Sequence, residues 1–376
     1  MKFIDLNRQY AAYKDEIDAV VHRVLESGQF ILGDGLERLE AGLSRYVGAR
    51  YAIGVSSGTD GLVLALMAYG VGPGDEIVTT PFTFIATAEA VCLVGARPVF
   101  VDIDPATYNI DVCKLKSVID ERKKAGASVR GIIPVGLYGQ CPDMDEINAI
   151  ARAEGLFVIE DACQSFGAGY KGRRSCALSD IGVTSFFPSK PLGAYGDAGM
   201  IFTDSEEIAK SCLSLRVHGQ SGRYYHEAVG LNARLDAIQA EILLVKFAHF
   251  EDELEKRRQA AQVYTEKLKE ALPDVTPPHV LSDRTSVYAQ YTVRVPAGAR
   301  DEAARFMNGR GIPTAVHYPM PLHLQPAFKK LGLGHGAFPE AERAAKEVLS
   351  LPMHPFISKE EQESVIEAMT EAISSL

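Results

Sequence analysis

Short apolar runs alternate with helical patterns over the first two-thirds of the chain. The apolar runs are rich in β-branched residues and are expected to form strands at residues 51–55, 76–80, 97–103, 131–138, 156–162 and 183–187. Helical spacing of apolar residues is found at 62–70, 85–95 and 144–155. Strands that alternate with helices predict βαβ units, and therefore an α/β fold with a mostly parallel sheet covered on both faces.

The pattern changes after about residue 235. Residues 236–272 form a single long amphipathic helical pattern that ends at Pro273. The remaining residues predict one strand at 287–295 and helices at 301–311, 339–349 and 359–373. We therefore expect a large domain over residues 1–245, with a helical amino-terminal arm, and a smaller α+β domain over residues 246–376.

Composition narrows the classes of function. The 376 residues include 39 Lys and Arg against 49 Asp and Glu, a formal charge of −10, which argues against a broad nucleic-acid interface. The sequence contains no uncharged apolar run of about 18 residues, so we expect no membrane insertion. The six cysteines show no CxxC pair and no metal-ligand spacing. We expect reduced thiols, no bound metal and a cytoplasmic location.

A glycine-containing turn follows the first expected strand. Ser57, Gly58 and Thr59 lie between that strand and the helix expected at 62–70. A turn at the amino end of a helix presents backbone N–H groups and the positive end of the helix dipole, which together can bind a phosphate. Ser57 and Thr59 could add hydroxyl donors. The alternative is that these residues only cap the helix.

Two further residues suggest the chemistry that a phosphate site would serve. Asp161 ends the strand at 156–162, and Lys190 follows the strand at 183–187 on a loop rich in Pro, Gly and Ser, 29 positions later. Taken singly, each could be an ordinary capping or surface residue. Together with the turn, they match the needs of pyridoxal phosphate: a cradle for the phosphate, a carboxylate for the ring nitrogen and a lysine for a Schiff base.

At these residues the sequence resembles the DegT/DnrJ/EryC1/StrS sugar aminotransferases. The resemblance includes Asp161 with Gln164 and the run from Ser185 to Lys190 followed by Gly193, and it extends over essentially the whole chain. It implies the aspartate-aminotransferase fold (fold type I), with a seven-stranded large-domain sheet. The segments IIPVGLYGQCPDMDEINAIA, EDACQSFGA, SVYAQYTVR and PTAVHYPMPL resemble the subgroup that aminates C3 of a UDP-linked 3-keto sugar uronate.

The resemblance also implies roles for individual residues. Lys190 would bind the cofactor covalently and act as the general acid and base. Asp161 would pair with the pyridine nitrogen, Gln164 would bond the ring hydroxyl and Phe84 would stack on the ring; the alternative for Phe84 is an ordinary core aromatic. The residues expected at the cofactor phosphate are Ser57, Gly58, Thr59, Ser185 and, from the neighbouring subunit of a homodimer with shared active sites, Asn232.

Substrate contacts are expected from two segments. Arg234 resembles an arginine that binds a carboxylate, and His317 and Tyr318 resemble residues that reach the sugar. Arg216 and His218 belong to a loop, residues 215–227, that could bind the diphosphate and uracil of a nucleotide sugar. The alternative for this loop is a solvated segment with scattered charge.

The resulting hypothesis is a ping-pong transamination. Glutamate would convert the cofactor to pyridoxamine phosphate and leave as 2-oxoglutarate, and the UDP-linked keto sugar would then take up the amino group, in bacterial surface-polysaccharide synthesis. Three alternatives remain open: an aminotransferase for another nucleotide-linked keto sugar such as a dTDP-deoxyhexose, a different pyridoxal-phosphate reaction, and a cofactor-bound sensor without turnover.

Overall fold

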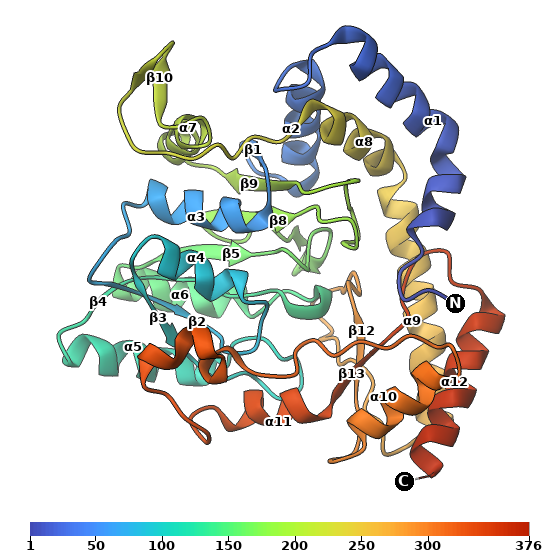
Figure 1. Ribbon diagram of the computed structural model, residues 1–376. Coiled ribbons are helices and arrows are strands. Elements are labelled where there is room, and N and C mark those ends of the chain that lie inside the picture. Colours follow the sequence, from blue (N-terminus) through green and yellow to red (C-terminus); the bar gives the residue numbers. More distant parts are fainter. Residues whose placement is uncertain (376) are drawn as a thin grey trace.

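The computed structural model describes residues 1–375 and confirms the α/β class (Figure 1). Its α-helices are α1 (Leu6–Ser27), α2 (Asp34–Val47), α3 (Gly58–Ala68), α4 (Ala86–Leu93), α5 (Val112–Lys124), α6 (Met144–Glu154), α7 (Glu206–Leu215), α8 (Ala237–Ala248), α9 (Phe250–Ala271), α10 (Arg300–Gly309), α11 (Pro339–Glu347) and α12 (Lys359–Ser374). Its strands are β1 (Tyr51–Val55), β2 (Asp75–Thr79), β3 (Arg97–Phe100), β4 (Ser128–Ile132), β5 (Phe157–Asp161), β6 (Gly169–Tyr170), β7 (Arg173–Arg174), β8 (Ile181–Ser185), β9 (Gly199–Thr203), β10 (Gln220–Gly222), β11 (Tyr225–His226), β12 (Tyr291–Arg294) and β13 (Val348–Leu351). Short 3-10 helices are η1 (Leu137–Gly139), η2 (Leu322–Leu324) and η3 (Pro326–Leu331).

Within the described residues, seven strands form the central sheet in the order β1-β9-β8-β5-β4-β2-β3. β9 runs antiparallel to β1 and β8, whereas the other neighbouring pairs are parallel. The carboxyl ends of β1, β8 and β5 therefore point to the same edge of the sheet. In open α/β sheets ligands bind beyond that edge, so the topology itself indicates where to look for a site.

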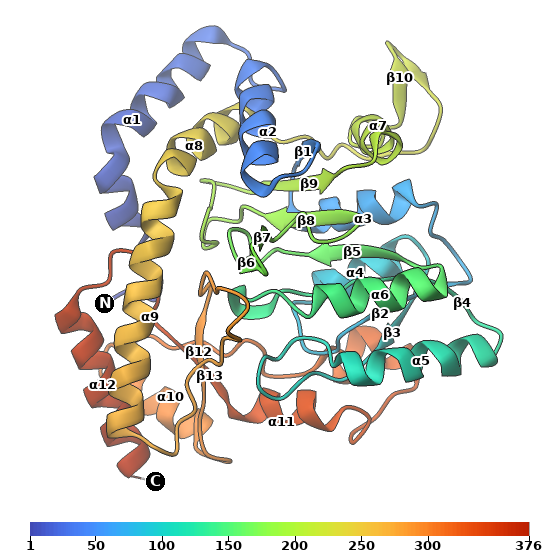
Figure 2. The ribbon, with the colours of Figure 1, turned by 180° about the vertical axis from the view of Figure 1, so that it is seen from behind.

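Helices cover both faces of the sheet, as the continuous apolar strands predict (Figures 1 and 2). α3, α4 and α7 pack on one face, and α2, α5 and α6 pack on the other. Because strand side chains alternate between faces, Ile201 of β9 faces the first layer while its neighbours Met200 and Phe202 face the second. Among the helices of residues 1–375, none has an apolar stretch long enough to cross a bilayer.

The carboxyl-terminal region forms a smaller unit around the β12–β13 pair. Apolar residues of α9, α10 and α12 pack with these two strands in a separate cluster. The single long helix predicted over 236–272 is wrong, because the chain leaves the helical conformation at His249 (φ −103°, ψ 2°). The break lets α8 pack against α1 and α2 while α9 packs against α12. The division at residues 245/246 remains a prediction.

One strand was missed and two other expectations need correction. No element was predicted at residues 199–203, but Gly199–Thr203 forms the fully buried strand β9, inserted between β1 and β8. The strand expected at 131–138 ends at Ile132, after which the chain turns into η1. The helix expected at 339–349 ends at Glu347, because the next residues pair with β12 as β13.

Candidate active site

A cavity of about 480 Å³ lies at the edge of the sheet where β1, β5 and β8 end. It brings together residues from the turn between β1 and α3, the ends of β5 and β8, the loop after β8 and the smaller unit. The predicted site residues that line it are Ser57, Gly58, Thr59, Phe84, Asp161, Gln164, Ser185, Lys190, His317 and Tyr318. Ser57 and Tyr318, which are 261 positions apart in sequence, thus line the same cavity.

One end of the cavity is built for an anion. Ser57 caps α3, and its Oγ accepts a 3.0 Å hydrogen bond from the Asp60 N–H. The first N–H groups of a helix have no partner inside it, and they carry the positive end of the dipole. A Cβ at Gly58 would come within 2.7 Å of Cys163 Sγ and 2.9 Å of Ser185 Cβ, so only glycine lets the backbone approach so closely. Helix start and Ser185 together fit a phosphate.

Asp161 is the buried carboxylate of the site, with 4% of its surface exposed. It ends β5, where its Oδ2 accepts a 2.7 Å hydrogen bond from Thr87 Oγ1 and its Oδ1 accepts a 3.2 Å bond from the Cys163 N–H. Both oxygens are thereby oriented before any ligand binds. A buried carboxylate that faces a cavity calls for a cationic or N–H partner, which a protonated pyridine nitrogen supplies.

Lys190 lies half-buried on the loop between β8 and β9. Burial is the main influence on its amine and lowers the pKa of Lys190, while the nearby Cys163 and Asp161 act in the opposite direction. A lowered pKa increases the fraction of neutral amine, which is the nucleophilic form. Two side chains of α8 position the loop that carries Lys190. Lys246 donates a hydrogen bond to the Gly193 carbonyl, and Gln239 Oε1 accepts one from the Tyr195 N–H at 2.8 Å.

Gln164 and Tyr318 connect the sheet to the smaller unit. Gln164 Oε1 accepts a 2.9 Å hydrogen bond from the Tyr138 N–H, and its Nε2 donates to Tyr318 Oη at 3.1 Å. An amide nitrogen carries two hydrogens, so one remains for a ring hydroxyl. Phe84 is 54% exposed, and its ring centroid lies 6.2 Å from that of Tyr318. Phe84 is therefore a cavity wall open for stacking, and not a core aromatic.

His317 is neutral at physiological pH in this environment. Its Nδ1 lies 2.8 Å from Ser350 Oγ, and burial, followed by the nearby Lys190, lowers the pKa of His317 from 6.5 to about 4. The folded-state pKa of His317 lies below the value of 6.5 that applies in the unfolded chain. The contribution of this residue to the free energy of unfolding is therefore fully present above pH 6.5 and is lost as the pH falls through 4.

We therefore expect His317 to show no titration step near pH 6.5. A histidine NMR titration, with the His317→Gln variant to assign the resonance, should give a midpoint close to 4. A midpoint near 6.5 would show that the imidazole is solvated and its environment is not as described.

Four predicted residues lie outside the cavity lining. The backbone of Arg234 forms an isolated β-bridge with Val55 at the end of β1. The side-chain Nε of Arg234 is buried without a hydrogen-bond partner in the described chain. Asn232 is exposed on the same segment. Arg216 does not reach the cavity, because its Nη1 donates to Glu40 Oε1 at 2.7 Å and to the Gly54 carbonyl at 2.9 Å. Its placement is that of a buried structural ion pair.

His218 is exposed where the chain enters the β10–β11 hairpin, which projects from the body of the subunit (Figure 1). Its carbonyl lies 2.9 Å from His226 Nδ1. His218 is not among the residues that line the cavity, and its expected role in substrate binding stays a prediction.

Sequence reasoning missed Thr87, which orients Asp161. A signal was present, because Thr87 is a hydroxyl residue only three positions after Phe84, and the structure places it in the first turn of α4, where both residues line the cavity. Ser350 and Gln290 were also missed. Gln290 immediately precedes β12 and Ser350 lies in β13. These strands pair residues as far apart as Tyr291 and Leu351, 60 positions in sequence, and no local pattern predicted it.

Curated relatives match nearly the whole chain. One from Pseudomonas aeruginosa, named UDP-2-acetamido-2-deoxy-3-oxo-D-glucuronate aminotransferase, is 50% identical over 98% of this chain and 99% of its own length. Another, from Geobacillus stearothermophilus and named pleiotropic regulatory protein, is 49% identical over 98% of this chain and 97% of its own length.

Solved structures of the family share the fold. An aminotransferase from Brucella abortus has a TM-score of 0.95 at 40% identity, with 99% of each chain covered. NtdA from Bacillus subtilis, solved with bound pyridoxamine phosphate, has a TM-score of 0.89 at 33% identity and covers 99% of this chain and 83% of its own. The phosphate cradle at Gly58, the carboxylate of Asp161 and the amine of Lys190 fit that cofactor.

The sequence model of the family matches residues 11–370. The protein is thus a pyridoxal-phosphate-dependent aminotransferase. The chain belongs to the DegT/DnrJ/EryC1/StrS aminotransferase family.

Proposed function

We propose that the protein transfers the amino group of glutamate to C3 of a UDP-linked 2-acetamido-3-keto sugar uronate, in the cytoplasm and for bacterial surface polysaccharides such as O-antigen. The observation that carries this proposal is that Lys190 and Asp161 line the same cavity as His317 and Tyr318 of the smaller unit. The identity of 50% with the Pseudomonas aeruginosa relative supports the choice of sugar.

Pyridoxal phosphate supplies an aldehyde that accepts the amino group and a ring that withdraws electrons from the reacting carbon. Asp161, oriented by Thr87, keeps the ring nitrogen protonated. Lys190 Nζ would take the proton from the α-carbon of the amino donor and would return it to the cofactor carbon that takes up the nitrogen, so that the lysine itself neither gains nor loses a proton overall. The start of α3, with Ser185, binds the phosphate and prevents the ring from rotating during these transfers.

We further propose that a homodimer completes the site. Asn232 is exposed on the segment beside the end of β1, and Arg234 offers a guanidinium whose Nε has no partner in the described chain. Across a dimer interface, Asn232 would reach the partner's cofactor phosphate. Arg234 would form a bidentate pair with a carboxylate of glutamate or of the uronate.

A half-reaction tests the substrate assignment. The protein is loaded with cofactor and glutamate, excess glutamate is removed, and candidate keto sugars are added while the visible absorbance of the cofactor is followed. We expect the UDP-linked 3-keto uronate to restore the starting absorbance at least about 10-fold faster than a dTDP-linked 4-keto deoxyhexose.

Buffer without sugar is the control for spontaneous recovery. A faster reaction with the 4-keto sugar would overturn the substrate assignment but leave the aminotransferase intact. Recovery that needs no amino donor would favour a lyase or dehydratase. An absence of any response to glutamate would support the sensor alternative.

A further inference from the structure

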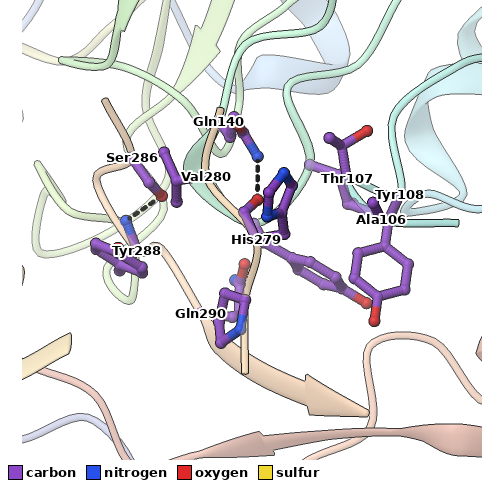
Figure 3. Close-up of a pocket in the computed structure, with 12 residues that line it drawn as sticks. Ala106, Thr107, Tyr108, Gln140, His279, Val280, Ser286, Tyr288 and Gln290 are labelled. Atoms are coloured by element: carbon purple, nitrogen blue, oxygen red, sulfur yellow. Dashed lines mark hydrogen bonds between the residues drawn. The ribbon is translucent and has the colours of Figure 1, made fainter. Parts of the chain in front are cut away.

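Gln290 lies in the wall between the active-site cavity and a smaller hollow behind it. Its side chain lines both spaces. The smaller hollow, of about 20 Å³, is bordered by Tyr108, Tyr138 and Tyr288 and is large enough only for a water molecule (Figure 3). A substrate group that meets Gln290 therefore has to approach from the active-site cavity.

Gln290 lies close to the residues that support His317. It occupies a bend immediately before β12 and lines the same cavity as His317. Two residues later, Thr292 Oγ1 lies 2.8 Å from Ser350 Oγ, which in turn lies 2.8 Å from His317 Nδ1. Gln290 and His317 therefore reach the cavity from segments that the β12–β13 pair joins.

The amide oxygen of Gln290 has no partner. Its Oε1 is buried, and within residues 1–375 no donor reaches it. Buried polar groups in native proteins are nearly always hydrogen-bonded, so an unpaired acceptor beside an active-site cavity calls for a donor from the ligand. An amide oxygen can only accept a hydrogen bond, so the ligand group that bonds to Gln290 Oε1 must carry an O–H or N–H.

We propose that Gln290 accepts a hydrogen bond from the sugar of the keto substrate, from the donor on a ring carbon next to the reacting carbonyl. This inference rests on the proposed function. Asp161, Gln164 and the start of α3 come from the sheet side and would hold the cofactor, whereas Gln290, His317 and Tyr318 enter the same cavity from the smaller unit. For a 3-keto sugar the donor is the acetamido N–H at C2 or the hydroxyl at C4.

The test uses the full-length protein loaded with cofactor, and the variant Gln290→Leu, which keeps the volume and removes the acceptor. We expect the KM for the UDP-linked 3-keto uronate to rise about 5- to 10-fold, the cost of one neutral hydrogen bond. The glutamate half-reaction, the cofactor spectrum and the thermal unfolding midpoint should not change. Gln262→Leu, on the exposed face of α9, is the matched control and should match the wild type.

Two analogues identify the donor, one lacking the C2 acetamido group and one lacking the C4 hydroxyl. The analogue that lacks the true donor should bind wild type and Gln290→Leu equally, because the bond is absent in both cases. If Gln290→Leu does not fold, Gln290→Met replaces it.

An unchanged KM, equal effects with both analogues, or a slowed glutamate half-reaction would overturn the inference. If the wild type rejects the uronate, the proposed function fails instead. The same comparison is then made with whichever keto sugar restores the absorbance.

Discussion

Lys190→Ala is expected to abolish transamination in both half-reactions. The variant loses the amine that binds the cofactor aldehyde and the base that moves the proton, and proton transfer alone contributes roughly 10²–10⁴-fold. We expect a loss of at least about 10⁴-fold in kcat. Reduction of the loaded protein with borohydride, followed by intact-protein mass measurement, should show a permanent cofactor adduct in the wild type and none in the variant.

Lys210→Ala is the matched control, because Lys210 is an exposed lysine of α7 that pairs with Glu206. It should keep both the activity and the mass adduct. An adduct of the same yield in Lys190→Ala would show that another lysine binds the cofactor. The buried Lys246, whose pKa burial lowers to about 8, would then be the first to examine.

Asp161→Asn is expected to have the second-largest effect. The asparagine has the same shape and can still accept from Thr87 or the Cys163 N–H, but it no longer carries the charge that keeps the ring nitrogen protonated. Removing one preorganised electrostatic contact typically costs about 10²–10³-fold in kcat, and we expect this loss in both half-reactions. Because Lys190 is untouched, the borohydride adduct should still form.

The control is Asp197→Asn, at an exposed aspartate that lines the same cavity. If general negative charge in the cavity mattered, this variant would lose as much as Asp161→Asn. We expect less than about 10-fold, since exposed charges interact weakly with a site through water. Equal losses in the two variants would refute a specific role for Asp161.

Much of the cofactor site could be predicted from local sequence because of the topology of the sheet. Ser57 and Lys190 follow the apolar strands β1 and β8, and Asp161 is the last residue of β5; these three strands run in the same direction. Residues that follow parallel strands meet at one edge, so three separate local patterns converge on one cavity without any knowledge of long-range contacts. The structure brings all three into the same lining.

The contacts between distant segments could not be predicted in this way. β9 was not predicted as a strand. Its place and its antiparallel direction depend on pairing with β1 and β8, which lie far from it in sequence or across a loop, and local pattern does not report such pairing. Arg216 was expected at the substrate because the loop around it is basic. Its ion pair with Glu40, 176 positions away, depends on how α2 packs beside β1.

The sequence by itself determined the α/β class, the cofactor and half of the residues that line the cavity, because strand period, turn residues and chemical type are local properties. The tertiary structure alone decided the break at His249, the support of Asp161 by Thr87, and the meeting of Gln290 with the cavity. These features depend on which surfaces pack together, and packing joins side chains by shape and hydrogen bonding across large separations along the chain.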